Sequence, residues 1–180
     1  MEFQKVIEAR QSVRSFNGKE VSEDIIRSMI AAAQEAPSWK NTQTSRYYVI
    51  NTASQVKNFR ETVLPSFNQN STADATVYIV STFRKNISGF NKATGEADNE
   101  VGNGWGAYDL GLHDMLLCAK ATELGVDTLI MGIRDADVVA QFCDIPADEQ
   151  VMAIIAVGYR ADNVTAKPAK KDVDVVTKFI

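Results

Sequence analysis

The sequence has few of the residues that build metal sites and disulfide frameworks. Its 180 residues include two cysteines, Cys118 and Cys143, and one histidine, His113. Both cysteines lie in apolar segments, no spacing typical of a metal site is present, and one histidine cannot form a cluster. We therefore expect two buried thiols, a reducing compartment and no bound metal.

Long apolar runs and an excess of positive charge are lacking too. No stretch approaches the roughly 20 apolar residues that a membrane-spanning helix needs, and residues 1–5 lack the basic-then-apolar order of a signal peptide. The 19 basic and 23 acidic residues give a net charge of −4, whereas nucleic-acid-binding proteins usually carry a basic field. We expect a cytoplasmic protein that binds neither nucleic acid nor a membrane.

The residues that are present suit one ordinary globular domain. Hydrophobic residues make up 45% of the chain and charged residues 23%, so a core of normal size can form. Apolar periodicity, caps and prolines predict alternating helices and strands. Helices are expected at 3–10, 22–36, 54–64, 106–124 and 136–142, and strands at 46–50, 75–81, 128–133 and 151–158. This pattern predicts an α+β domain with a small central sheet and an extended arm from about residue 160.

Two segments invite a functional interpretation. Apolar residues surround most of the helix expected at 106–124, which is typical of a helix buried in the core or at a subunit contact. The preceding run, 83–105, is rich in Gly, Asn and Lys. A loop of that length in a small domain is either a functional flap or a disordered insert.

The segment Arg10-Gln11-Ser12-Val13-Arg14 places two guanidiniums around a hydroxyl. In an extended conformation Arg10, Ser12 and Arg14 would share one side and could form a cradle for an anion. In a helix, Arg10 and Arg14 would share a face and Ser12 would point away. The alternative is a solvated basic face with no specific role.

Four landmarks, in order along nearly the whole chain, resemble the nitroreductase family of FMN-dependent oxidoreductases. The first is Arg10-x-Ser12-Val13-Arg14-x-Phe16, and the second is Ala36-Pro37-Ser38-x-x-Asn41-x-Gln43. The third is the long helix from Asp109 to Gly125. The last is Met131-Gly132 before a helix, followed by Ile155-Ala156-Val157-Gly158-Tyr159.

This resemblance implies a fold, a cofactor and a reaction. The nitroreductase-like fold has a small, mainly antiparallel sheet flanked by helices, and it forms an intertwined homodimer with each flavin between subunits. The implied activity passes a hydride from NADH or NADPH through flavin N5 to a nitroaromatic, quinone or similar small acceptor, by a ping-pong mechanism. The cofactor carries the chemistry, so no side chain is expected as the catalytic nucleophile.

The resemblance also implies which residues bind the cofactor. The first motif would hold the phosphate and the polar edge of the ring, with Arg14 beside N1 and O2, where a cation stabilises the reduced flavin. Hydroxyl and amide groups of the second motif would meet the ribityl chain and ring carbonyls. Met131 and Gly132 would lie beside N5, and Lys170 or Lys171 would contact the phosphate. The expected cofactor-binding residues are Arg10, Gln11, Ser12, Arg14, Pro37, Ser38, Asn41, Gln43, Met131, Gly132, Lys170 and Lys171.

Each of these features also has a plainer interpretation. The second motif could be an ordinary polar loop after a proline, Gly132 could be a simple turn, and exposed lysines often bind nothing. Thr44-Ser45 stands where the family commonly has Pro-Trp. Alternative functions are a flavin-storage protein without turnover, or a relative that performs reductive dehalogenation or flavin fragmentation.

Overall fold

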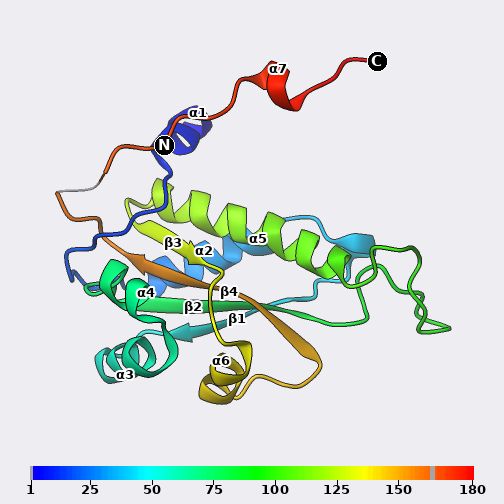
Figure 1. Ribbon diagram of the computed structural model, residues 1–180, viewed down its shortest axis with the longest axis horizontal. Coiled ribbons are helices and arrows are strands. Elements are labelled where there is room, and N and C mark those ends of the chain that lie inside the picture. The colour runs from blue at the N-terminus through cyan, green and yellow to red at the C-terminus, as the bar shows by residue number, and fades with distance from the viewer. Residues whose placement is uncertain (1, 163–164) are drawn as a thin grey trace.

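A four-stranded antiparallel sheet lies at the centre of the molecule. The computed structural model describes residues 2–162 and 165–180. The strands are β1 (Ser45–Ile50), β2 (Val77–Arg84), β3 (Asp127–Met131) and β4 (Glu149–Gly158), in the order β1-β2-β4-β3 (Figure 1). All three strand pairs are antiparallel. β2 and β4 are therefore central, and β1 and β3 form the two edges.

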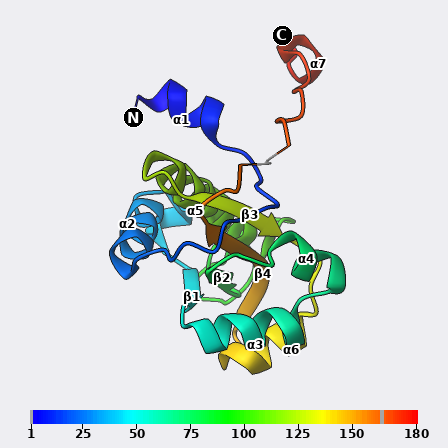
Figure 2. The same ribbon diagram turned by 90° about the vertical axis from the view of Figure 1, so that its left-hand side faces the viewer.

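Helices cover both faces of the sheet, so the body has three layers (Figure 2). α2 (Glu23–Gln34) and α5 (Gly104–Glu123) pack on one face, and α3 (Ala53–Val63) and α6 (Ala136–Cys143) on the other. Because its strands are covered on both sides, β2 is buried from Val77 to Phe83. The buried apolar residues form two clusters, one on each face. This arrangement confirms the expected α+β architecture, a small antiparallel sheet flanked by helices.

Local signals set most element ends where the sequence predicts them. Ser22 caps α2 by accepting a hydrogen bond from the Ile25 backbone N–H at 3.4 Å, and Asp135 caps α6. β2 begins at Val77 and runs three residues past the expected end at Ser81. The short α4 (Ser66–Ser71) was not expected, because its sequence SFNQNS has no apolar period and follows Pro65 directly.

The two end segments of the described chain project from the same side of the body (Figure 2). They are α1 (Phe3–Ala9) and the arm that carries α7 (Val173–Val176). Lys167 Nζ ties the arm to α1 by donating to the Ile7 and Glu8 carbonyls at 2.9 and 3.2 Å. No helix among the described residues has the length and apolar character to cross a bilayer.

Candidate functional site

The segment from Arg10 to Arg14 is extended and lies along the edge strand β3. The Val13 N–H donates to the Thr128 carbonyl at 3.0 Å, and Ser12 forms a parallel bridge with Thr128. Val13 is completely buried, whereas Ser12 and Arg14 are exposed. The extended alternative is thus confirmed, because alternation along a strand sends Val13 to the core and its two neighbours outward.

A second contact holds this segment from its other end. The Asn17 N–H donates to the Tyr159 carbonyl, and the Ala161 N–H to the Ser15 carbonyl, both at 3.0 Å. Arg160 Nε donates to the buried Asp127 carboxylate at 2.8 Å. This ion pair could not be predicted from local spacing, since 33 residues separate its partners. Arg160 is therefore engaged with Asp127, while Arg14 remains directed to solvent.

Arg14 shares a pocket of about 190 Å³ with Met131 and Gly132. Phe67 and Ser71 of α4 also line this pocket, so the helix that the sequence did not predict forms one wall. A Cβ placed on Gly132 would have no neighbouring atom within 4 Å, so the backbone here is open to a flat ligand. The fold thus brings together Arg14 and the Met131-Gly132 strand end, which are more than a hundred residues apart in sequence.

The second motif forms a turn with an unusual backbone. It contains the short helix η1 (Trp39–Asn41), and Lys40, Asn41 and Gln43 have positive φ angles of 46, 56 and 50°. Residues other than glycine adopt this left-handed region at a cost of about 1–2 kcal/mol each. Ser38 Oγ closes the turn by accepting from the Gln43 N–H at 3.0 Å. We call residues 38–43 the motif turn.

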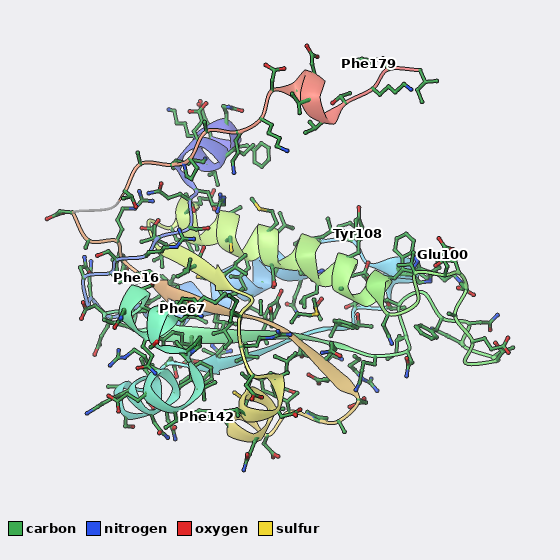
Figure 3. All side chains as sticks on the ribbon, viewed as in Figure 1. Phe16, Phe67, Glu100, Tyr108, Phe142 and Phe179 are labelled. Carbon is green, nitrogen blue, oxygen red and sulfur yellow. The ribbon has the colours of Figure 1, made fainter. Side chains whose placement is uncertain are left out.

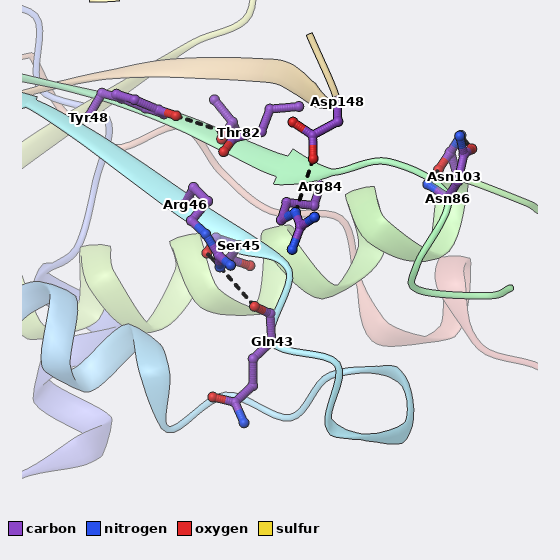
Figure 4. A network of polar contacts seen from close by, with 10 residues as sticks. Gln43, Ser45, Arg46, Tyr48, Thr82, Arg84, Asn86, Asn103 and Asp148 are labelled. Atoms are coloured by element: carbon purple, nitrogen blue, oxygen red, sulfur yellow. Dashed lines mark hydrogen bonds and ion pairs between the residues drawn. The ribbon is translucent and has the colours of Figure 1, made fainter. Parts of the chain in front are cut away.

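Beside the motif turn lies a polar pocket of about 370 Å³, lined by Gln43, Arg46 and His113 among others. Arg46 Nη1 donates to the Gln43 and Ser45 carbonyls at 2.9 and 2.8 Å (Figure 4). His113 Nδ1 lies 2.7 Å from the Asp109 carbonyl oxygen. Because a carbonyl can only accept, the neutral imidazole carries its proton on Nδ1. His113 is thus held in one tautomer, as a buried residue of α5.

A buried carboxyl lies behind this pocket. Asp114 accepts from Tyr47 Oη at 3.2 Å and from Ser81 Oγ at 3.0 Å. Burial raises the pKa of Asp114 to about 6 despite these hydrogen bonds. Burial and the nearby Asp114 carboxylate also raise the pKa of Tyr47 far above its usual range. Asp114 therefore gains a proton near pH 6, well above the usual range of a carboxyl.

The two groups of candidate residues lie at opposite edges of the sheet. Arg14 and Gly132 adjoin β3, whereas Ser38, Asn41 and Gln43 precede β1, and β2 and β4 separate these strands. Three strand spacings of about 4.8 Å put the edges roughly 14 Å apart. One chain therefore does not gather all the residues of the two motifs around one small ring.

Lys170 and Lys171, the basic pair of the arm, differ from Lys167 in their contacts. Lys170 and Lys171 are exposed, and neither has a hydrogen bond or ion pair to the Arg10–Arg14 segment within the described residues. Lys167 is the arm lysine that contacts the end of α1, where a cation meets free carbonyls at the negative end of the helix. Sequence spacing could not reveal it, because the contact depends on the path of the arm.

A protein-family model described as the nitroreductase family matches residues 7–159. The chain belongs to the nitroreductase family. The match spans both edge segments, so this nitroreductase-family chain carries the two motifs within the matched region. No curated protein is similar enough to the chain to be matched.

Several solved structures are similar in fold over almost the full chain. A putative NAD(P)H:FMN oxidoreductase from Staphylococcus epidermidis is 18% identical with a TM-score of 0.83, covering 99% of this chain and 96% of the other. A nitroreductase family protein from Streptococcus pneumoniae is 18% identical with a TM-score of 0.82, covering 99% and 100%. A BluB-like flavoprotein from Clostridium difficile is 25% identical with a TM-score of 0.76, covering 100% and 99%.

Proposed function

We propose that this protein is an FMN-dependent oxidoreductase that takes electrons from NADH or NADPH and passes them to a small acceptor. The observation that carries the proposal is the shared pocket of Arg14, Met131 and Gly132 in a nitroreductase-family chain. Similar proteins are described as an NAD(P)H:FMN oxidoreductase and as an oxidoreductase containing FMN. These descriptions support a flavin cofactor for this family member.

The residues present fit FMN by their chemistry. Arg10, Ser12 and Arg14 offer the guanidinium and hydroxyl donors that suit a phosphate and the polar edge of the ring. The open backbone at Gly132 suits close approach of a flat ring. The hydroxyl and amides of the motif turn suit the ribityl chain and ring carbonyls. Lys167 joins Lys170 and Lys171 as a basic residue of the arm that could reach the phosphate.

The separation of the two motifs supports a homodimer with each flavin between subunits. α5 exposes Tyr108, Met115 and Leu116, which are 60%, 45% and 36% accessible. On the arm, Val176 and Phe179 are 70% and 88% accessible, and Tyr108 and Phe179 both lie on the outer side of α5 (Figure 3). Exposed apolar side chains gathered on one side of a small protein are typical of an interface. A second copy would bring its motif turn to the Arg14 pocket of the first.

When bound, FMN supplies reversible hydride chemistry at N5, which accounts for a ping-pong reaction between a nicotinamide and an acceptor such as a nitroaromatic or quinone. The protein's part is to bind and to orient. The Arg14 guanidinium would stabilise negative charge at the pyrimidine edge of a bound ring. A ring face left accessible in the dimer would admit each substrate in turn, whereas flavin storage would need a covered ring face.

The deciding experiment is an anaerobic titration of the purified protein. We expect flavin absorbance that NADH or NADPH bleaches and that a nitroaromatic or a quinone restores. A protein that stays colourless after incubation with FMN would contradict the proposal. Bound flavin that neither nicotinamide reduces would instead favour storage, dehalogenation or flavin fragmentation with another electron donor.

A further inference from the structure

The loop between β2 and α5 packs against the motif turn through polar, ionic and aromatic contacts. Ser88 of this loop is 1% exposed, and its hydroxyl lies 2.7 Å from Thr42 Oγ1 and 3.3 Å from Thr44 Oγ1. Lys40 Nζ forms an ion pair with Asp98 Oδ2 at 3.0 Å. The rings of Trp39 and Trp105, on either side of this junction, have centroids 4.7 Å apart.

A buried carboxylate at the start of α5 connects the loop to the turn. Asp109 is 3% exposed, and its Oδ2 accepts from Ser88 Oγ at 2.8 Å and from the Trp39 N–H at 3.0 Å. Ser88 has one hydroxyl hydrogen and donates it to this carboxylate. The hydroxyls of Thr42 and Thr44 therefore donate to Ser88 Oγ. This network leaves each of its hydroxyls with a defined partner and direction.

The backbone of the motif turn needs such external support. Three of its six residues have positive φ without being glycine, and such conformations persist where the surroundings fix them. Inside the turn, the Asn41 N–H donates to the Ser38 carbonyl and the Thr42 N–H to the Trp39 carbonyl, both at 2.9 Å, and one side chain, Ser38, accepts from the Gln43 N–H. The contacts from Asp109 and Ser88 reach Trp39 and Thr42, which flank the left-handed residues Lys40 and Asn41 on both sides.

We infer that Ser88 and Asp109 are positioning residues that hold the motif turn in the shape needed to bind flavin. The 85–103 loop is then a brace for the neighbouring turn. Its own structure suits that role, since Asp98 N–H donates to the Gly89 carbonyl at 2.7 Å and Trp105 Nε1 to Asn99 Oδ1 at 2.9 Å. Gly89 is required because a Cβ would lie 2.5 Å from Trp105 Cδ1. That flavin binding needs this conformation of the motif turn rests on the proposed function.

The test compares Ser88→Ala and Asp109→Ala with Asp109→Asn, which keeps an oxygen acceptor, and with Ser28→Ala as a control. Ser28 Oγ donates to the Asp24 carbonyl within α2, so its loss removes a hydroxyl far from the network. Hydrogen exchange in the flavin-free full chain reports the order of residues 38–43. Fluorescence quenching of FMN reports its affinity, and circular dichroism reports overall folding.

We expect Ser88→Ala and Asp109→Ala to speed exchange at residues 38–43 and to weaken FMN binding, each about tenfold, as loss of buried hydrogen bonds predicts. Exchange in β2 and β4 should not change. The exchange rate at residues 38–43 and the FMN affinity of Asp109→Asn should stay within about threefold of those of the unmodified protein, because its amide oxygen still accepts. Ser28→Ala should have the same exchange rate and FMN affinity as the unmodified protein. If Asp109→Ala does not fold, Ser88→Ala decides.

Unchanged exchange at residues 38–43 in Ser88→Ala would overturn the inference. Faster exchange with unchanged FMN affinity would overturn it as well, because the turn's shape would then not matter for the flavin. Failure of the proposed function is distinguishable: the unmodified protein would bind no FMN, while the exchange data would still show whether the brace holds the turn.

Discussion

The two edges of the sheet hold their candidate residues in opposite ways. At the β3 edge, backbone hydrogen bonds to Thr128 and Tyr159 fix residues 13–17 and leave the side chains of Ser12 and Arg14 outward. At the β1 edge, buried side chains fix a turn whose backbone is itself unfavourable. The first edge is therefore robust to loss of a polar side chain, whereas the second depends on such side chains for its shape.

The sharpest test of this comparison is complementation between two damaged chains. One chain carries Arg10→Ala and Arg14→Ala, and the other carries Ser38→Ala and Asn41→Gly, where glycine keeps the left-handed backbone. Each homodimer should lose nearly all FMN binding. When the chains are mixed after unfolding and refolding, heterodimers form one intact site, so about a quarter of all sites should recover under the two-fold symmetry of a dimer.

Absorbance of retained flavin after gel filtration measures this recovery. A mixture that binds no more FMN than the separate variants would show that both motifs serve one site within a single chain. A monomeric elution volume for the unmodified protein would contradict the shared site directly.

The β1 side should also respond to pH more than the β3 side. The pKa of Asp114 is raised from about 4 to about 6 in the folded state, so between these values the folded protein binds more protons than the unfolded chain. Stability should therefore fall as pH rises from 4 to 6, by at most about 3 kcal/mol. Asp114→Asn should remove that slope.

Denaturant unfolding of both proteins at several pH values checks the expectation. Asp24→Asn, an exposed carboxyl in the first turn of α2, is the matched control and should keep the slope. A slope that persists in Asp114→Asn would show that other groups set the pH dependence.

At the β3 edge, the side chain of Arg14 should matter for the ligand and little for the fold. Arg14→Ala should weaken FMN binding by about a hundredfold, corresponding to roughly 2.7 kcal/mol for a hydrogen-bonded charge. Its melting temperature should hardly change, because Arg14 is exposed and donates one hydrogen bond to the Ser12 carbonyl. Arg27→Ala, which breaks an exposed pair with Glu23, should bind FMN normally. An FMN affinity unaltered by Arg14→Ala would refute the role assigned to that residue.

The smallest expected effect tests the backbone of the motif turn. Lys40→Gly removes the cost of a left-handed residue and loses an exposed ion pair with Asp98. The free energy of unfolding should rise by less than about 1 kcal/mol. Thermal unfolding of Lys40→Gly and of a control, Lys57→Gly, measures the direction of the change. Lys57 lies within α3, where glycine should lower the stability by about the same amount. A loss of stability in Lys40→Gly would mean that the ion pair outweighs the strain.

Local chemistry in the sequence determined most of the fold. Apolar periodicity and caps such as Ser22 and Asp135 mark elements that depend on neighbours within a few residues, so α2, α6 and the strands could be predicted. The motifs around Arg14 and Asn41 could be recognised because their residue types and spacing are local as well. α4 escaped prediction, since Ser66–Ser71 has no period and forms one wall of the Arg14 pocket only after folding.

Only the tertiary structure decided where these local pieces meet. The strand order puts the two motifs at opposite edges of the sheet, and no sequence spacing encodes a distance that depends on pairing between remote strands. The same holds for Asp109 and Ser88, which lie 21 residues apart and become partners through burial. Local propensity acts over a few residues, whereas contacts across the core depend on how all the elements pack together. The sequence therefore indicates which residues are candidates for binding, and the tertiary structure determines which of them lie close together.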